Sequence, residues 1–211
     1  MPLVTITRQY GSGGSAVAAG VADRLGWQLL DNAIVDAIAQ QMGVSADTVR
    51  ALDERQPPLI ARIADALALE AREVLSPTAG AAMVSPDERV IETTRRVMEA
   101  AVAQGPVVVV GRGAQVVLSQ RTDAVHVFCY APRETLVRRV AARDSLTLAA
   151  AERRVDEINH QRAAMVRQHY GRTWGAPENY HLCLNTEWLG IDGAVDLIVE
   201  AVHSAGRRIR V

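Results

Sequence analysis

The sequence predicts an α/β domain in which a parallel sheet is flanked by helices, and three observations predict it. The run Val107 to Val110 is continuously β-branched, which is typical of a strand buried on both faces. Other strand-like runs alternate with helical segments, and this alternation implies parallel strands joined by right-handed crossovers. A glycine-rich stretch, Arg8 to Ser15, directly follows the first of these runs. With 211 residues, 49% of them apolar, the chain suits a single domain over residues 1–211.

The first elements are predicted as strand, loop and helix, followed by a second strand. Residues 3–7 are apolar and β-branched, and residues 16–25 have the Ala-rich composition of a helix. Residues 27–30 form the second, shorter strand. Asp31 stands at the carboxyl end of this strand, where it can also cap a helix over residues 33–42.

Residues 31–106 are longer than a single crossover helix requires. We expect a helical insertion here that helps to close over a substrate. Pro57 and Pro58 open a long amphipathic helix, whose apolar stripe can face the core or form a homodimer surface. The sequence Ser85-Pro86-Asp87-Glu88 is a strong helix start, because it has a capping Ser, a Pro in the first turn and a Glu three residues after the Ser.

The second half of the chain continues the alternation after a turn at Gly111-Arg112-Gly113. Arg139 and Arg143, on the first helix after Pro132, fit solvated positions more readily than ligand contacts. The elements expected here are strands over residues 124–130 and 181–185, helices that begin at Pro132 and span residues 148–169 and 191–204, and a loop over residues 171–177.

In an open parallel sheet, ligands bind at the carboxyl ends of the strands. This rule predicts one rim of candidate functional residues. The rim consists of Gly11 to Ser15, Asp31, Gly111 to Gly113, Tyr130 to Arg133 and Asn185 to Glu187.

The stretch from Arg8 to Ser15, called the glycine loop below, is a candidate phosphate site. Glycines allow a sharp turn, and the unpaired N–H groups at the start of the following helix then face an anion. The usual nucleotide-binding loop is G-x-x-x-x-G-K-[ST]. Only Gly13 and Ser15 fit it, because Arg8 stands in place of the first Gly and Gly14 in place of the Lys. An ordinary strand-to-helix turn is the alternative.

Two further arginines have arguments of their own. Arg112 lies between two glycines directly after the buried valine run, and therefore at the ligand rim. On an ideal helix, Arg162 falls within an apolar stripe that includes Val155 and Met165. A charge on a buried stripe needs a partner, which is either an anion in an active site or a structural carboxylate.

The chain resembles the nucleoside monophosphate kinases of the P-loop fold, and in particular their cytidylate-kinase-like branch. The resemblance extends over most of the chain but is specific only in patches. These patches are Ile6-Thr7-Arg8-Gln9-Tyr10-Gly11-Ser12-Gly13-Gly14, residues 25–31, Val110-Gly111-Arg112-Gly113, Val127-Phe128-Cys129-Tyr130-Ala131-Pro132 with Arg138-Arg139, Trp174-Gly175, residues 182–186 and residues 189–191.

The resemblance implies ATP as phosphoryl donor, Mg²⁺, and a CMP-like acceptor. The phosphates of ATP would lie on the glycine loop at Gly11, Ser12, Gly13, Gly14 and Ser15, with Ser15 as a Mg²⁺ ligand. Asp31 and Arg112 would hold the acceptor. A lid over residues 146–176 would bring Arg162 and Arg167 to the transferred phosphoryl group and exclude water.

Three departures from the family pattern concern the chemistry directly. Gly14 replaces the loop lysine, Val110 replaces an Asp before the Gly-Arg pair, and Gly113 replaces the Asp that follows this pair. Our hypothesis is that Arg8 folds back over the loop and supplies the missing positive charge. Two alternatives remain: a catalytically weak or inactive nucleotide or anion sensor on a kinase scaffold, and a kinase of another small metabolite.

Composition limits the remaining function classes. A net charge of −1, with no lysine in the chain, argues against a nucleic-acid binder. No apolar run approaches the roughly 20 residues of a membrane span, and no signal sequence is visible, so we expect a cytoplasmic protein. Cys129 and Cys183 are expected to be buried reduced thiols, and the five histidines have no metal-ligand spacing. Tyr10 and Trp174 could stack on a base, although Trp174 also fits a loop anchor in the core.

Overall fold

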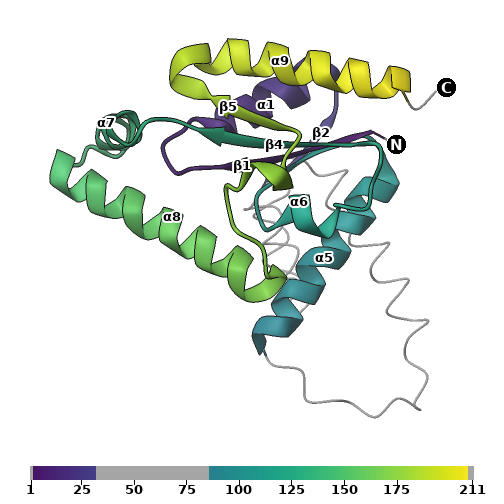
Figure 1. Cartoon of the computed structure of the whole chain (residues 1–211), viewed down its shortest axis with the longest axis horizontal. Coiled ribbons are helices and arrows are strands. Elements are labelled where there is room, and N and C mark those ends of the chain that lie inside the picture. The colour runs from purple at the N-terminus through teal and green to yellow at the C-terminus, as the bar shows by residue number, and fades with distance from the viewer. Residues whose placement is uncertain (1, 32–85, 209–211) are drawn as a thin grey trace, which may run out of the picture.

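The computed structural model describes residues 2–31 and 86–208, and its centre is a five-stranded sheet (Figure 1). The strands are ordered β2-β3-β1-β4-β5, and all four neighbouring pairs are parallel, as the sequence predicts. The carboxyl ends of all five strands therefore lie along one edge. The strands are β1 (Leu3–Arg8), β2 (Gln28–Leu30), β3 (Val107–Val110), β4 (Ala124–Tyr130) and β5 (Leu182–Asn185).

Helices cover both faces of the sheet (Figure 1). On one face lie α1 (Gly14–Leu25) and α9 (Thr186–Arg208), and on the other lie α5 (Pro86–Gln104) and the short α6 (Ala114–Val117). The valine run of β3 shows why both faces must be apolar. Val108 and Val110 pack with α1 and α9, whereas Val107 and Val109 pack with α5 and α6.

The helices α7 (Arg133–Asp144) and α8 (Leu148–Tyr170) pack against each other. Their shared core consists of Leu136, Val137, Val140, Ala151 and Val155, with Tyr10 of the glycine loop packed against it. This contact joins the α7–α8 pair to the carboxyl edge of β1.

Most predicted elements agree with the structure, and the differences have local causes. The helix α6 was not predicted, because its four residues are too few for a helical period. The helix α9 begins at Thr186 rather than Ile191, but it is broken at Gly190, whose φ of 71° and ψ of 179° are not helical. The prediction for Cys183 was wrong: this thiol is exposed on the edge strand β5, and only Cys129 is buried. The helices predicted between residues 33 and 79 lie outside the described residues.

A buried histidine pair joins the sheet strands to the start of β5. The His126 side chain on β4 is buried, its Nδ1 lies 2.8 Å from Oγ1 of Thr5, and its ring stacks on His181 at 4.9 Å between centroids. The backbone N–H of His126 donates to Nδ1 of His181 over 3.0 Å. Burial, and then the neighbouring His181, lower the pKa of His126 to about 4.

This depressed pKa predicts a loss of stability in acid. The unfolded chain binds a proton at His126 near pH 6.5, whereas the folded chain does so only near pH 4, so the free energy of unfolding falls as the pH falls through this window. We expect His126 to account for about 2 kcal/mol of this fall between pH 7 and pH 4.5. Urea unfolding of the wild type and of His126→Asn across this range measures the difference. Parallel curves for the two proteins would contradict it.

Candidate functional site

The glycine loop lies between β1 and α1 in the predicted order of strand, turn and helix. Gly11 and Gly13 have φ values of 87° and 78°, and Gly13 is the N-cap of α1. The buried side chain of Ser12 donates from Oγ to the carbonyl of Gln9 over 2.8 Å. The free N–H groups in the first turn of α1 make this end of the helix electropositive.

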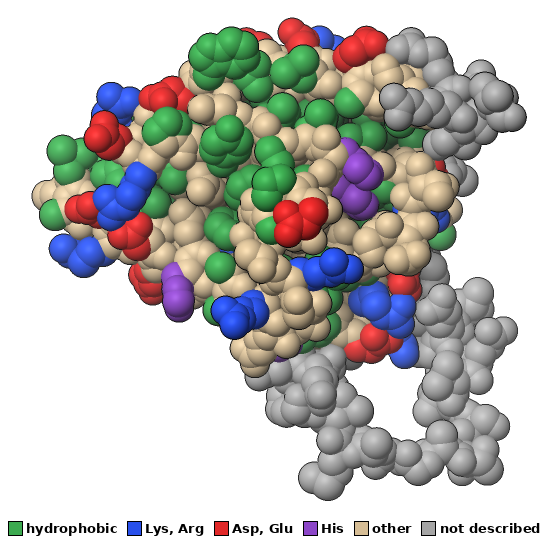
Figure 2. Space-filling model, in the orientation of Figure 1, with side chains coloured by type: hydrophobic (Ala, Val, Ile, Leu, Met, Phe, Trp, Pro, Cys, Tyr) green, Lys and Arg blue, Asp and Glu red, His purple; other side chains and the backbone are tan. Residues whose placement is uncertain are grey.

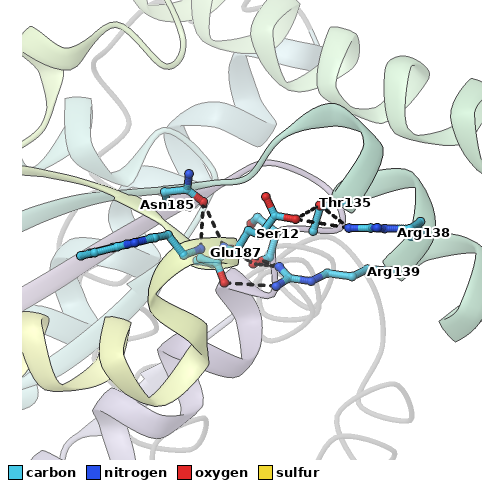
Figure 3. A network of polar contacts seen from close by, with 8 residues as sticks. Ser12, Thr135, Arg138, Arg139, Asn185 and Glu187 are labelled. Carbon is cyan, nitrogen blue, oxygen red and sulfur yellow. Dashed lines mark hydrogen bonds and ion pairs between the residues drawn. The ribbon is translucent and has the colours of Figure 1, made fainter.

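Two side chains from other elements hold the loop through the carbonyl of Ser12 (Figure 3). This oxygen accepts from Oγ1 of Thr186 over 2.6 Å and from Arg139 over 3.2 Å. Arg139 also donates to the carbonyl of Thr186 over 3.1 Å. The sequence position of Arg139 suggested a solvated helix residue, and this prediction was wrong. Its guanidinium joins α7 to the loop and to the start of α9.

Arg8, the last residue of β1, occupies space beside Gly14. A Cβ atom at Gly14 would lie 2.5 Å from Cβ and 3.0 Å from Cγ of Arg8. Separations below 3.0 Å require something to shift. A lysine at position 14 would therefore force the Arg8 side chain or the backbone to shift, because the Arg8 stem packs where a loop lysine would leave the backbone.

The arginines 8, 112 and 162 line one cavity. Burial first, and then the positive charge of Arg162, lower the pKa of Arg8 to about 10, and Asp31 partly opposes this shift. Burial also lowers the pKa of Arg162, which donates to the carbonyl of Arg8 over 2.7 Å. Among the described residues, the buried Nε atom of Arg8 has no hydrogen-bond partner. The cavity has a volume of about 320 Å³ and is lined by Thr7, Arg8, Gly111, Arg112, Gly113, Gln115, Ile158, Gln161, Arg162, Met165, Val166 and Trp174.

This internal cluster differs from the outer surface. On the face shown in Figure 2, basic and acidic side chains are interspersed and do not gather into a basic stripe. Burial weakens the hydration of the cavity's guanidinium groups, and their mutual repulsion adds to the cost. An anion in the cavity would offset both effects, so the arrangement suits a ligand with one or more phosphate groups.

The backbone of Arg112 is held in a left-handed conformation. Its φ is 53°, between Gly111 at 77° and Gly113 at 70°, and its carbonyl accepts from the hydroxyl of Tyr170 over 3.3 Å. Left-handed geometry costs roughly 1–2 kcal/mol for a residue with a side chain, so surrounding contacts must maintain it. Tyr170 does so from the end of α8, and its ring leaves no room for a side chain at position 113. A Cβ there would lie 2.2 Å from Cε2 of Tyr170.

This crowding predicts that Gly113→Ala is more destabilising than an alanine at a comparable but open glycine. Gly26 is the matched control, because its φ of 65° is similar and, among the described residues, nothing lies within 4 Å of its Cβ position. We expect losses in the free energy of unfolding of about 1 kcal/mol for Gly26→Ala and about 2–4 kcal/mol for Gly113→Ala. Urea titration of both variants measures them, and equal losses would show that the Tyr170 ring moves aside freely.

The other predicted site residues are more dispersed. Ser15 is exposed on the first turn of α1, and Asp31 follows β2 close enough to Arg8 to raise its pKa. Arg167 is exposed on α8 and does not line the cavity. Trp174 combines the two roles considered for it, because it lines the cavity and also packs edge-on against Phe128 with ring centroids 5.5 Å apart.

Two kinds of site are not found in the described part of the chain. Residues 2–31 and 86–208 contain no group of three or more His, Cys, Asp or Glu side chains that could hold a metal ion. Nor does any helix within these ranges have the length and apolar character needed to cross a membrane.

Comparison with known proteins shows the family and the fold of the chain. The sequence model of the cytidylate kinase-like family matches residues 3–188. No curated protein matches the sequence. Among solved structures, the chain is similar to an uncharacterized protein from Eubacterium ventriosum, with 17% identity, a TM-score of 0.71 and coverage of 97% of this chain and 99% of that chain.

Two enzymes of known name share the fold. Shikimate kinase from Acinetobacter baumannii is 17% identical with a TM-score of 0.50, over 97% of this chain and 94% of that chain. A gluconokinase from Sinorhizobium meliloti is 12% identical with a TM-score of 0.53, over 99% of this chain and 95% of that chain. These likenesses confirm the predicted P-loop type of α/β fold.

Proposed function

This chain belongs to the cytidylate kinase-like family, and from that membership we propose that it transfers the γ-phosphoryl group of ATP to an acceptor phosphate, most simply that of CMP or a related nucleotide. The observation that carries the proposal is the cavity that Arg8, Arg112 and Arg162 line, in which Arg8 also packs beside Gly14, the first residue of α1. Phosphoryl transfer requires mainly positioning and neutralisation of charge, and this cavity offers both.

Each residue has a proposed role that follows from its place. The loop from Gly11 to Ser15 binds the phosphate chain of the donor at the N-terminus of α1, as helix N-termini bind anions. The N–H of Ser12 does not take part, because it donates to the carbonyl of Gln9 over 3.2 Å. Arg8 neutralises the negative charge of the phosphates, which is the role of the lysine in the usual loop. Arg112 and Asp31 hold the acceptor, and Arg162 stabilises the charge that develops on the transferred group, with Arg167 approaching when the lid is closed.

Mg²⁺ is the proposed metal cofactor, with Ser15 as its protein ligand. Ser15 is exposed on the first turn of α1, and its hydroxyl oxygen is a hard metal ligand. Mg²⁺ keeps several waters and binds substrate phosphates, so one protein ligand beside the phosphate site fits this ion. The ion would supply charge neutralisation on the phosphate oxygens.

The proposed organisation follows the same logic. We propose that residues 1–211 form one domain with a lid over residues 146–176, and that the insertion predicted over residues 31–106, most of which lies outside the described residues, serves the acceptor. Within the lid, α8 carries Arg162, whose guanidinium donates to the carbonyl of Arg8. Exclusion of water by these two segments would protect ATP from hydrolysis. The amphipathic segment predicted to begin at Pro57 lies outside the described residues, and we propose it as a candidate homodimer surface.

Two other functions have observations in their favour. Gly14 stands where the usual nucleotide-binding loop has a Lys, and Gly113 stands where cytidylate kinases have an Asp after the Gly-Arg pair, which favours a nucleotide or anion sensor without transfer. A kinase of a small metabolite keeps the chemistry and changes the acceptor, as in shikimate kinase and gluconokinase, whose names state acceptors that are not nucleotides.

A coupled assay of ADP release distinguishes these functions. Purified protein with ATP and Mg²⁺ is tested against nucleoside monophosphates and then against hydroxylated and carboxylated metabolites. Turnover with a CMP-like nucleotide supports the proposal. Turnover only with a metabolite would show that the acceptor is a metabolite and not a nucleotide. ATP binding by calorimetry without turnover on any acceptor supports the sensor.

A further inference from the structure

Tyr10 connects the middle of the glycine loop to the helices α7 and α8. Its backbone N–H donates to Oδ1 of Asn159 on α8 over 2.8 Å. Its hydroxyl donates to Asp144, at the end of α7, over 3.0 Å and accepts from Arg143 over 2.5 Å. Thus both the backbone and the side chain of one loop residue contact the pair of helices.

The ring of Tyr10 contacts two guanidinium groups. Cζ of Arg143 lies 4.8 Å from the ring centroid, and Cζ of Arg162 lies 5.8 Å from it. Both distances are within the range of a cation–π interaction. Arg143 is exposed, whereas Arg162 lines the cavity, so the ring links the outer surface of α7 to a charge inside the site.

Arg162 has few other constraints among the described residues. Its guanidinium donates to the carbonyl of Arg8, and both burial and the nearby positive charge of Arg8 act against a guanidinium at this place. A ring face provides attraction without adding a fixed negative charge. The guanidinium therefore keeps its capacity to bind an anion while its position is restricted.

We propose that Tyr10 is a positioning residue for phosphoryl transfer, which fastens the glycine loop to α8 and thereby holds Arg162 in the cavity. The inference rests on the proposed function. The phosphate site and the charge on α8 then move as one unit, because Tyr10 belongs to the loop and contacts the helix. Tyr10 is thus assigned to the protein's own architecture and not to stacking on a nucleotide base.

The side-chain and backbone contacts can be separated by substitution. Tyr10→Leu removes the ring and the hydroxyl but keeps the N–H that binds Asn159. Tyr10→Phe keeps the ring against Arg162 and loses only the hydroxyl. We expect Tyr10→Leu to lower kcat about 10-fold with a change of less than about 2-fold in KM for ATP, and Tyr10→Phe to restore most of kcat.

A kinetic cycle with Arg162 tests whether Tyr10 acts through this residue. The full-length wild type, Tyr10→Leu, Arg162→Ala and the double variant are compared with the acceptor that the wild type uses. If Tyr10 positions Arg162, the leucine substitution has almost no further effect on kcat once Arg162 is absent. An equal loss in both backgrounds would overturn the proposal.

Hydrogen exchange separates this inference from the proposed function. In Tyr10→Leu, amide protection over residues 155–166 of α8 is expected to fall about 10-fold, with α9 unchanged. Unchanged protection of α8 would overturn the fastening. If protection falls but the wild type transfers phosphate to no acceptor, the link between loop and helix stands and the proposed function alone fails.

Discussion

Replacing Arg162 by alanine is expected to lower kcat about 100- to 1,000-fold, with a much smaller change in ATP affinity. The guanidinium lies in the cavity with Arg8 and Arg112, where it would meet the charge that develops on the transferred group. A single arginine that acts in this way can contribute a factor of about 10³–10⁵. We expect a factor at or below the lower end of this range, because two other arginines share the charge.

The control for this prediction lies on the same helix. Arg154 is exposed, and its guanidinium pairs with Glu157 one turn further along α8. Arg154→Ala therefore removes one positive charge from α8 without reaching the cavity. Steady-state kinetics of both variants, with unfolding curves to verify the fold, measure the difference. Similar kcat values for Arg162→Ala and Arg154→Ala would remove Arg162 from the reaction.

Introducing the lysine of the usual loop is expected to abolish activity. Gly14→Lys writes the common motif residue into the sequence, but its Cβ would lie 2.5 Å from Cβ of Arg8. The overlap involves the stem of Arg8 near the backbone, which cannot rotate away as a side-chain end can. We expect a loss of about 1–3 kcal/mol in the free energy of unfolding and of at least about 100-fold in kcat/KM.

Replacing Arg8 by glycine is expected to lower activity for a different reason. Arg8→Gly relieves no strain and removes the positive charge that we assign to the phosphates. The expected result is at least a 10-fold weaker ATP affinity and about a 100-fold lower kcat/KM. Calorimetry with a non-hydrolysable ATP analogue measures the affinity. An unchanged affinity would exclude Arg8 as the replacement for the lysine.

Much of the fold could be predicted from the sequence because each part of it depends on local patterns. The valine run from Val107 to Val110 predicts a strand buried on both faces, and its alternate residues do pack against helices on opposite sides. The start of α5 at Pro86 follows from the capping pattern around Ser85. The short α6 has no such pattern, and it depends on the turn at Gly113 that precedes it.

The candidate site could be predicted less completely, because part of it depends on contacts across the fold. Strand ends and helical period suffice to select Arg112 and Arg162, and both line the cavity. Arg139 was misjudged, because its partners are carbonyls of Ser12 and Thr186 that only the folded chain brings near. The exclusion of a side chain at position 113 likewise depends on the ring of Tyr170 at the far end of α8.

The contact between Arg8 and Gly14 gives a physical meaning to the departure from the usual loop. The common motif has a glycine at the position of Arg8 and a lysine at the position of Gly14. The geometry disfavours one mixed combination, a lysine at position 14 beside the present Arg8, because their side-chain stems overlap. In the other mixed combination, glycine at both positions, the loop has no positive charge. The departure is therefore an exchange of one positive charge between two positions, in our account, and not the loss of a catalytic group.

The double variant Arg8→Gly/Gly14→Lys tests this claim most directly, because it writes G-Q-Y-G-S-G-K-S over residues 8–15. A lysine then replaces an arginine, and the overlap with Arg8 disappears, which leaves a close approach of 3.2 Å to Cβ of Cys129. We predict kcat/KM at least about 10-fold above either single variant, with the stability of the wild type largely restored. A double variant whose losses equal the sum of the two single losses in free energy would contradict the account.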